Sequence, residues 1–160
     1  MRNRWVVRAG LAAMTCVGAL LIPTVASAAP IDVDYFTITA NHVDFGNGNL
    51  GNISGRPTDD GQLDWNLVGG ELEPRLIGKI FLNNTSGGCG RMQLTYNWSG
   101  ADVTYSDSTW CAPNGQTWYA NVDFAPFADA SITSVTVRLQ YKTSSGAAWT
   151  TAGSSTWIPS

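Results

Sequence analysis

The chain of 160 residues has little of the chemistry from which common active sites are built. It contains a single histidine, His42, and beyond residue 28 only two cysteines and two glutamates. A serine hydrolase needs a histidine base beside its nucleophile. Asp44 could orient His42, but the chain has no nucleophile-elbow motif. The scarcity favours a binding protein over an enzyme and indicates that His42 is a surface histidine at a strand end.

The two glutamates, Glu71 and Glu73, offer one alternative to this interpretation. Residues two apart on a strand share a face and lie about 7 Å apart, which suits the carboxylate pair of a glycoside hydrolase. Arg75 and Lys79 follow on the same face, as is typical of a solvated strand. We therefore predict a solvated face and keep a hydrolase as the less favoured alternative.

Acidic residues also gather at Asp59, Asp60 and Asp64, where oxygen ligands for calcium could meet. Their spacing does not follow the EF-hand pattern, and Asp-Asp-Gly is common turn chemistry. We expect no metal and no cofactor, although whether these three side chains bind a metal stays open.

The N-terminus has the three parts of a secretory signal peptide. Arg2, Arg4 and Arg8 precede an apolar run over 11–22, and Ala-Ser-Ala ends at Ala28. Glycine, alanine and proline dilute the run, which argues against a retained transmembrane helix. We predict cleavage after Ala28, a single secreted domain over 29–160, and no membrane insertion of that domain.

Charge and cysteine content of the domain agree with secretion. Three of the nine basic residues lie in the first 28, which leaves six against twelve acidic residues and a net charge of −6. Nucleic acid and anionic membrane surfaces attract proteins of the opposite charge, so neither is expected as a partner. Cys89 and Cys111 form an even pair in an oxidising compartment, which predicts one disulfide.

Alternation of apolar and polar residues predicts an all-β domain. It is strongest over 71–82, 91–98, 117–124 and 134–142 and weaker over 31–39, 62–68, 103–111 and 147–158. Turn clusters separate these segments. We predict an antiparallel β-sandwich of seven or eight strands, immunoglobulin-like or jelly-roll-like, with a partly closed barrel as the alternative and residues 46–61 as a surface loop.

The strand after Cys89 predicts a hairpin with an irregularity. Pairing Tyr96 with Val103 buries the apolar side of both strands, but this register makes the two cysteines miss each other by one residue. A one-residue bulge in either strand reconciles them, and Gly88 or Gly90 is the favoured place for it. A disulfide between the two sheets is the alternative.

Aromatic residues are abundant for a domain of this size. Six tryptophans lie beyond residue 28, and we place three of them in the core: Trp65, Trp98 and Trp118. The aromatic side chains that fit the core less well are predicted to bind the ligand: Trp110, Tyr119 and Trp149. Exposed aromatics on an acidic secreted sandwich suit a polysaccharide or a protein surface.

The second half of the chain carries a resemblance. The runs "NNTSGGCGRMQLTY", "WCAPNGQTWYANVDFAPF" and "ITSVTVRLQYKTSSGAAWTTAGS" resemble a group of uncharacterised small secreted proteins of filamentous soil bacteria. The resemblance covers the chain from Phe81 onward. It implies a β-sandwich behind a signal peptide and implies no activity.

Together these features predict a secreted, monomeric and non-enzymatic binding module. Its ligand is expected to be an extracellular polysaccharide or another extracellular protein, such as one at the cell surface. A structural or inhibitor-like secreted protein is the second interpretation, and the hydrolase is the third.

Overall fold

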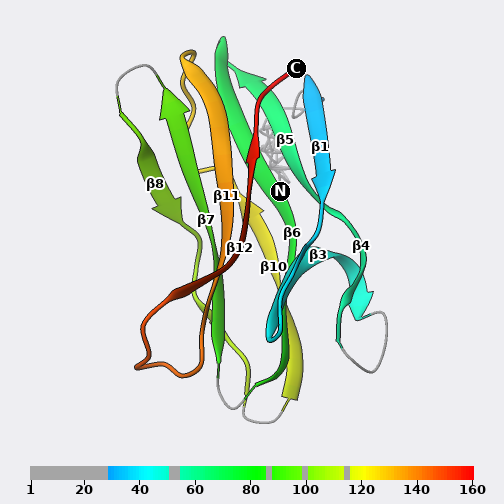
Figure 1. The fold of residues 1–160 in the computed structure, drawn as a ribbon. Helices are drawn as coiled ribbons and strands as arrows, with labels where there is room; N and C mark the ends of the chain where they lie inside the picture. The colour runs from blue at the N-terminus through cyan, green and yellow to red at the C-terminus, as the bar shows by residue number, and fades with distance from the viewer. Residues whose placement is uncertain (1–28, 51–54, 86–87, 99–100, 114–115) are drawn as a thin grey trace, which may run out of the picture.

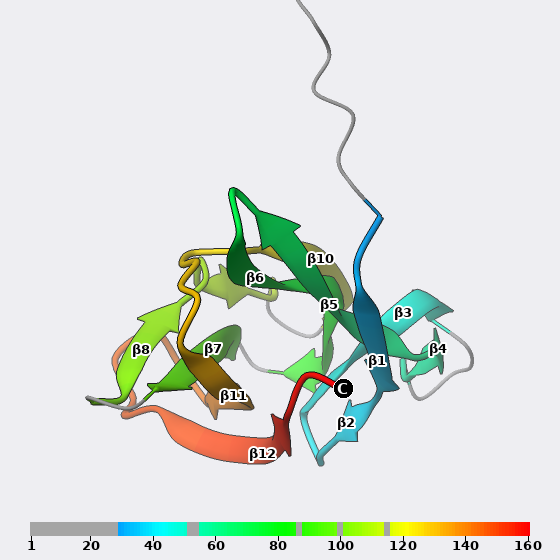
Figure 2. The same ribbon diagram turned by 90° about the horizontal axis from the view of Figure 1, so that it is seen from above.

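The computed structural model describes residues 29–50, 55–85, 88–98, 101–113 and 116–160, and the predicted signal peptide lies outside them. Two antiparallel β-sheets pack face to face (Figures 1 and 2). The predicted all-β sandwich with one disulfide is confirmed. In this part of the chain, no helix is long and apolar enough to cross a membrane.

The seven-stranded sheet, called the large sheet, has the order β1-β5-β6-β3-β2, with β10 on β6 and β4 on β3. Its strands are β1 (Asp32–Phe36), β2 (Ile38–Thr39), β3 (Val43–Leu50), β4 (Pro57–Asp59), β5 (Gly61–Val68), β6 (Glu71–Thr85) and β10 (Gln116–Phe124). The five-stranded sheet, called the small sheet, has the order β12-β11-β7-β8, with β9 on β7. Its strands are β7 (Cys89–Trp98), β8 (Val103–Ser106), β9 (Trp110–Cys111), β11 (Ile132–Lys142) and β12 (Thr150–Trp157).

The number of strands follows from their lengths. Eight of the described strands have five residues or more, in agreement with the predicted seven or eight. The other four, β2, β4, β8 and β9, have two to four residues each. The segment 103–111, predicted as one strand, is divided into β8 and β9, and β3 lies where the sequence pattern predicts no strand.

The core lies between the sheets and consists of the apolar half of each alternating strand. Trp65, Ile80, Leu94, Tyr96 and Val137 are all fully buried there. The indole Nε1 of Trp65 donates to Asp34 Oδ2 at 2.8 Å, so its polar atom is satisfied inside the sandwich. Burial of each large apolar side chain stabilises the fold by about 1.5–3 kcal/mol.

The two sheets meet along one edge, where β12 of the small sheet approaches β1 and β2 (Figure 2). The rings of Phe36 and Trp157 lie 5.2 Å apart across this edge. On the opposite side of the sandwich, β8 and β9 bound the small sheet and β10 bounds the large sheet.

Residues 46–61 were expected to form a surface loop. Residues 51–54 lie outside the described residues, and most of the others belong to strands, so the prediction is wrong for them. β3 runs on to Leu50, and β4 returns against it, pairing Asp59 with Asn47. Gly46 permits the close approach, because a Cβ there would lie 2.6 Å from the Pro57 Cβ. The described residues of this segment therefore lie in or beside the large sheet.

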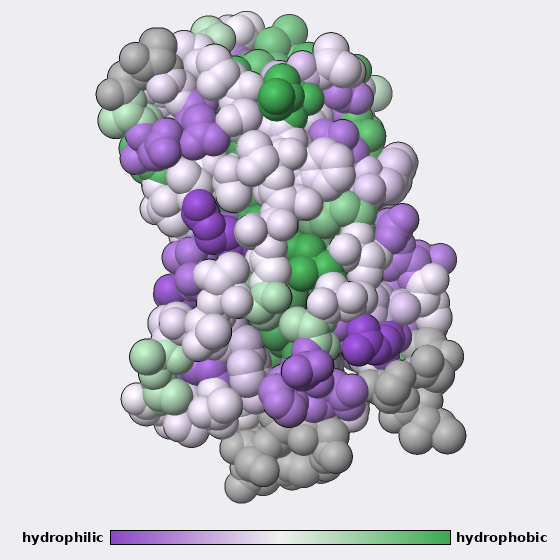
Figure 3. Space-filling model, in the orientation of Figure 1, coloured by the Kyte–Doolittle hydropathy of each residue, from purple (hydrophilic) through white to green (hydrophobic). Residues whose placement is uncertain are grey.

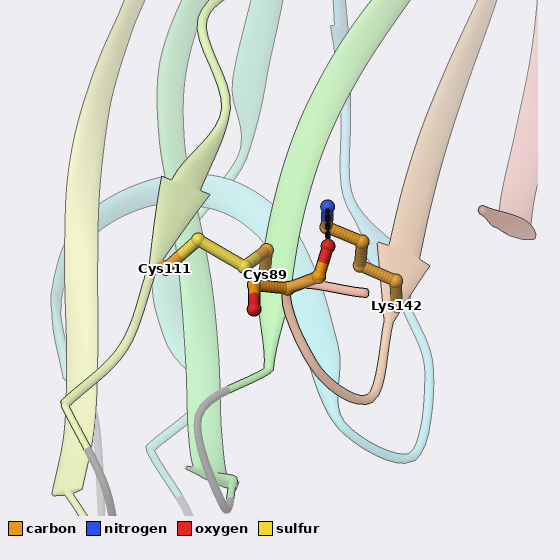
Figure 4. Close-up of a disulfide and its surroundings, with 4 residues drawn as sticks. Cys89, Cys111 and Lys142 are labelled. Carbon is orange, nitrogen blue, oxygen red and sulfur yellow. Dashed lines mark hydrogen bonds between the residues drawn. A yellow bond between two sulfur atoms is a disulfide. The ribbon is translucent and has the colours of Figure 1, made fainter. Parts of the chain in front are cut away.

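The hairpin of β7 and β8 has the register that the sequence predicts. Tyr96 pairs with Val103 and Leu94 with Tyr105. Farther along, Cys89 pairs with Cys111, one residue out of that register. The disulfide joins neighbouring strands of the small sheet, with Lys142 of β11 on the other side of Cys89 (Figure 4). The alternative of a bridge between the sheets is excluded.

The extra residue lies in the returning strand, so its predicted place at Gly88 or Gly90 is wrong. The backbone N–H of Asp107 donates to the Met92 carbonyl at 2.9 Å. Since Gly90 pairs with Trp110, the two residues 108 and 109 together oppose Arg91. The Asp107 Oδ1 accepts the Ser108 N–H at 2.6 Å and supports the local bend.

The glycines beside Cys89 serve close packing instead. A Cβ at Gly90 would lie 3.0 Å from Ile80 Cγ2 of the facing sheet. A Cβ at Gly88 would lie 2.6 Å from the Tyr141 hydroxyl. Both positions therefore favour glycine for its small size, and neither is the place of the bulge.

Replacing both cysteines by alanine should lower the free energy of unfolding by about 3 kcal/mol, because the bridge closes a loop across 22 positions. Urea denaturation of the Cys89→Ala/Cys111→Ala variant measures the loss. Wild-type protein under reducing conditions is the control and should unfold at a similar urea concentration. A loss under about 1 kcal/mol would contradict a stabilising bridge.

Candidate functional site

The three aromatic residues predicted to bind the ligand lie on three separate surfaces. Trp110 belongs to β9 at the edge of the small sheet. Tyr119 belongs to β10 of the large sheet and is 41% exposed. Trp149 lies between β11 and β12 against the outer face of the small sheet. They cannot form one stacking platform, so a shared ligand contact for all three has no geometric support.

Trp110 is half-buried and forms a pair with Trp118. Their ring centroids are 6.5 Å apart at an interplanar angle of 52°, too tilted for one flat sugar-stacking surface. Burial raises the pKa of the neighbouring Asp107, while the Ser108 N–H and the Trp110 indole lower it. This corner of the sandwich is a packed edge with one partly buried carboxyl.

Trp118 was predicted to lie in the core, and this is wrong because its side chain is 37% exposed. It shares the inward side of β10 with Ala120 and Val122, both of which are buried. β10 pairs with β6 on one side and is an edge strand of the large sheet. Trp118, near its beginning, is therefore open to solvent at this edge. Trp65 is fully buried as predicted.

Trp98 packs against the core as predicted. It is partly buried, and its ring stacks on Phe127 with centroids 5.1 Å apart. Phe127 also contacts Tyr96 and Tyr105, so one loop phenylalanine closes this end of the core.

Tyr119 packs on the outer face of the large sheet. Its ring lies 6.0 Å from the fully buried Phe81, and Lys79 Nζ lies 5.0 Å from its centroid. Sequence analysis did not identify Phe81, which has the outward phase of β6 and is nevertheless covered. Tyr119 thus shields an apolar residue of its own sheet.

The outer face of the small sheet has a different character, since polar side chains follow one another across four strands. One row crosses β8, β7, β11 and β12 and consists of Thr104, Thr95, Thr136 and Thr156. The first two hydroxyls are 2.8 Å apart and the last two 2.9 Å apart. We call this surface the polar face. Figure 3 looks onto it and shows mostly pale and purple residues with small green areas.

Amides continue the polar face on both sides of the threonine row. Gln93 Nε2 donates to Ser106 Oγ at 2.9 Å, and Asn97 Nδ2 donates to Ser134 Oγ at 2.7 Å. A primary amide can both donate and accept. These bonds hold the side chains in place while the face retains further hydrogen-bonding capacity.

Three cations lie on the polar face, although their alternation in the sequence predicts only a solvated strand face. Arg138 Nη1 donates to Thr95 Oγ1 at 2.5 Å, and Arg91 Nε donates to Gln140 Oε1 at 2.8 Å. The guanidinium carbon of Arg91 and the Nζ of Lys142 lie 4.2 and 4.8 Å from the centroid of a single ring, that of Trp149. Cation–π contacts of this kind hold a cationic group at a defined position over the ring.

No acidic residue occurs in any of the five strands of the small sheet. In the described residues the carboxylate ion pairs are Arg56–Asp44 and Arg75–Asp123, both on the large sheet. Among the described residues, the cations of the polar face therefore have no carboxylate partner. The domain is acidic in total, yet the strands of the small sheet contain basic residues and no acidic ones.

The candidate catalytic groups do not assemble. The ring of the exposed His42 stacks on Tyr141 at 5.6 Å. Asp44 is buried and accepts hydrogen bonds from the Ala40 N–H at 2.8 Å and from Arg56 Nη1 at 3.4 Å. The Asp44 carboxylate therefore binds the Ala40 backbone and Arg56, and it does not orient the ring of His42.

The three carboxylates considered for calcium have local hydrogen-bond partners. Asp59 accepts from Thr58, Asp60 from Thr37 and Asp64 from Gln62. Across the residues that the structure describes, no group of three or more histidine, cysteine, aspartate or glutamate residues is placed to hold a metal ion. Glu71 is exposed at the start of β6 and Glu73 is half-buried, so the predicted solvated strand face holds for Glu71 and in part for Glu73.

Compared with protein-family models, with curated proteins and with solved structures, the chain has no match in any of the three. The function proposed below therefore rests on the geometry and charge of the molecule.

Burial of Asp44 should make stability depend on pH. Burial raises its pKa above the ordinary 3.8, and the Ala40 N–H and Arg56 offset this only in part. A raised folded-state pKa favours folding at low pH, and this contribution is lost as the pH rises through it. The free energy of unfolding of Asp44→Asn, relative to wild type, should therefore increase from pH 4 to pH 7. Urea denaturation at both values measures it, and a decrease would contradict the account.

Proposed function

We propose that the chain is an extracellular binding module and that its ligand, a polysaccharide, lies on the polar face. The observation that carries the proposal is the unbroken run of hydroxyl, amide and guanidinium groups over β8, β7, β11 and β12. Neighbouring strands are about 4.8 Å apart, a distance comparable to the length of one sugar unit. Outward side chains along one strand are about 7 Å apart, so a sugar chain that lies along or across the strands meets a new polar side chain at about every sugar unit.

The composition of the polar face favours a sugar polymer over a protein. Protein interfaces have an apolar core with aromatic residues and a polar rim. Here the centre of the face consists of threonines, glutamines and arginines without an apolar core, and its aromatic residue, Trp149, lies at one end beside Lys142. A ligand rich in hydroxyls matches such a centre.

The side chains of the polar face suit binding rather than catalysis. Glycoside hydrolysis needs a carboxylic acid and a carboxylate on two sides of the bond. The strands β7, β8, β11 and β12 supply hydroxyls, amides and cations, which orient a sugar without transferring its protons. The disulfide of the same sheet suits an oxidising, extracellular setting.

A protein partner is the second candidate, favoured by a different surface. Exposed apolar side chains lie on β1, on β5 and just before β1: Ile31, Tyr35, Leu67 and Val68. Tyr35 is 65% exposed on β1, which pairs with β5 and forms an end of the large sheet. An edge strand with apolar side chains can dock an extracellular protein.

Purified residues 29–160 should be retained on at least one of five immobilised polysaccharides: chitin, cellulose, xylan, peptidoglycan and polygalacturonate. Removing two amides of the polar face, in Gln93→Ala/Gln140→Ala, should weaken retention about tenfold, since each lost hydrogen bond contributes about 0.5–1.5 kcal/mol. Titration of protein against matrix gives the affinity, and near-UV circular dichroism checks folding.

The control removes two amides from the large sheet, in Gln116→Ala/Asn121→Ala, and should bind as wild type does. Equal losses in both variants would contradict binding at the polar face. Retention on none of the five matrices would contradict the polysaccharide itself and favour the protein partner.

A further inference from the structure

We infer that the polysaccharide is an acidic one, a chain of uronic acid units whose carboxylates meet the cations of the polar face. The inference rests on the proposed function and names the chemical class of its ligand. Three of the six basic residues beyond residue 28 lie on this one surface: Arg91, Arg138 and Lys142. The five strands beneath them contain no carboxylate.

The three cations form a stripe along the strands. Arg138 and Lys142 are four residues apart on β11, which corresponds to about 13 Å. Arg91 of β7 pairs with Gln140, midway between them. The stripe therefore has the length of a short oligosaccharide and presents a positive charge at more than one sugar position.

Two of the cations are held in place before any ligand arrives. Arg91 donates to Gln140 and lies over the ring of Trp149, and Lys142 lies over the same ring. Groups that are already positioned lose less conformational freedom on binding. Trp149 therefore acts as a positioning residue for the cations.

A comparison with the large sheet shows what these cations lack. Arg75 uses Nε and Nη2 to bind both carboxylate oxygens of Asp123, at 2.6 and 2.7 Å. Arg138 instead donates to a threonine hydroxyl and Arg91 to an amide. A guanidinium prefers a carboxylate, and a uronate chain supplies one on every sugar.

The charge distribution distinguishes a uronate chain from denser polyanions. The acidic residues of the large sheet belong to the other layer of the sandwich, about 10 Å away, and a Debye length of about 8 Å at physiological salt weakens their repulsion of a chain on the polar face. A duplex or an anionic membrane carries many more charges, and the net charge of −6 of residues 29–160 disfavours both. The threonines and amides also match sugar hydroxyls rather than phosphates.

The experiment compares two polymers with the same sugar backbone, polygalacturonate with free carboxylates and its fully methyl-esterified, uncharged form. Residues 29–160 should bind the free acid about tenfold more tightly than the ester, and added salt should weaken binding to the free acid only. Isothermal titration calorimetry at two salt concentrations measures both effects.

Charge-matched variants locate the contact. Arg91→Gln/Lys142→Gln should weaken binding to polygalacturonate about tenfold, because each exposed ion pair contributes a few-fold. The control Arg75→Gln/Lys79→Gln changes the net charge equally on the large sheet and should keep most of the affinity. Trp149→Ala should weaken binding, and Trp149→Phe should restore part of it. All variants are first checked for a native thermal transition.

The outcomes separate the inference from the proposed function. Equal binding of acid and ester would overturn the inference and leave polysaccharide binding in place. Binding to neither polymer, nor to the neutral polysaccharides, would overturn the proposed function as well. Binding to single-stranded DNA or to vesicles containing phosphatidylglycerol, without binding to polygalacturonate, would overturn the inference in favour of a phosphate ligand.

Discussion

The alternation of side chains along β7 and β11 is the constraint on which the rest of the structure depends. Met92 and Leu94 pair with Leu139 and Val137, and all four are fully buried. A register shift of one residue would move these apolar side chains from the core to the solvent-exposed face of the sheet. The inward set therefore fixes the outward set, and the polar face is the other half of the same pattern.

A local irregularity lets this constraint coexist with the disulfide. The register that buries Tyr96 beside Tyr105 does not bring Cys89 to Cys111. Residues 108 and 109 add one position to the returning strand, beyond the end of β8. The bridge is formed without disturbing β7, whose register with β11 places Arg91 beside Gln140.

Sequence alone predicts much of this fold because strand alternation is a local property. The positions of the apolar residues predict the register of β7 with β8, and the positions of the cysteines predict its register with β9. The position of the bulge does not, because the demand for glycine at Gly90 comes from Ile80 in the facing sheet. Exposure of Trp118 depends likewise on β10 being the last strand of its sheet, which no local pattern reveals.

The candidate site was harder to predict for a related reason. Trp149 was singled out as an aromatic residue, but its contact with two cations depends on how the β11–β12 connection lies on the sheet. The absence of acidic residues from the strands of the small sheet is visible in the sequence. This absence indicates a cationic surface only once the strands are known to form one sheet. The negative net charge of the domain gives no sign of such a surface.

The central claim is that the ligand lies on the polar face, and nuclear magnetic resonance tests it most directly. Backbone amide shifts of residues 29–160 would be followed during titration with a short galacturonate oligomer. The account predicts that the largest shifts gather on β7 and β11, around Arg91, Arg138 and Gln140. Shifts gathered on β6 and β10, or at the edge formed by β9, would contradict it.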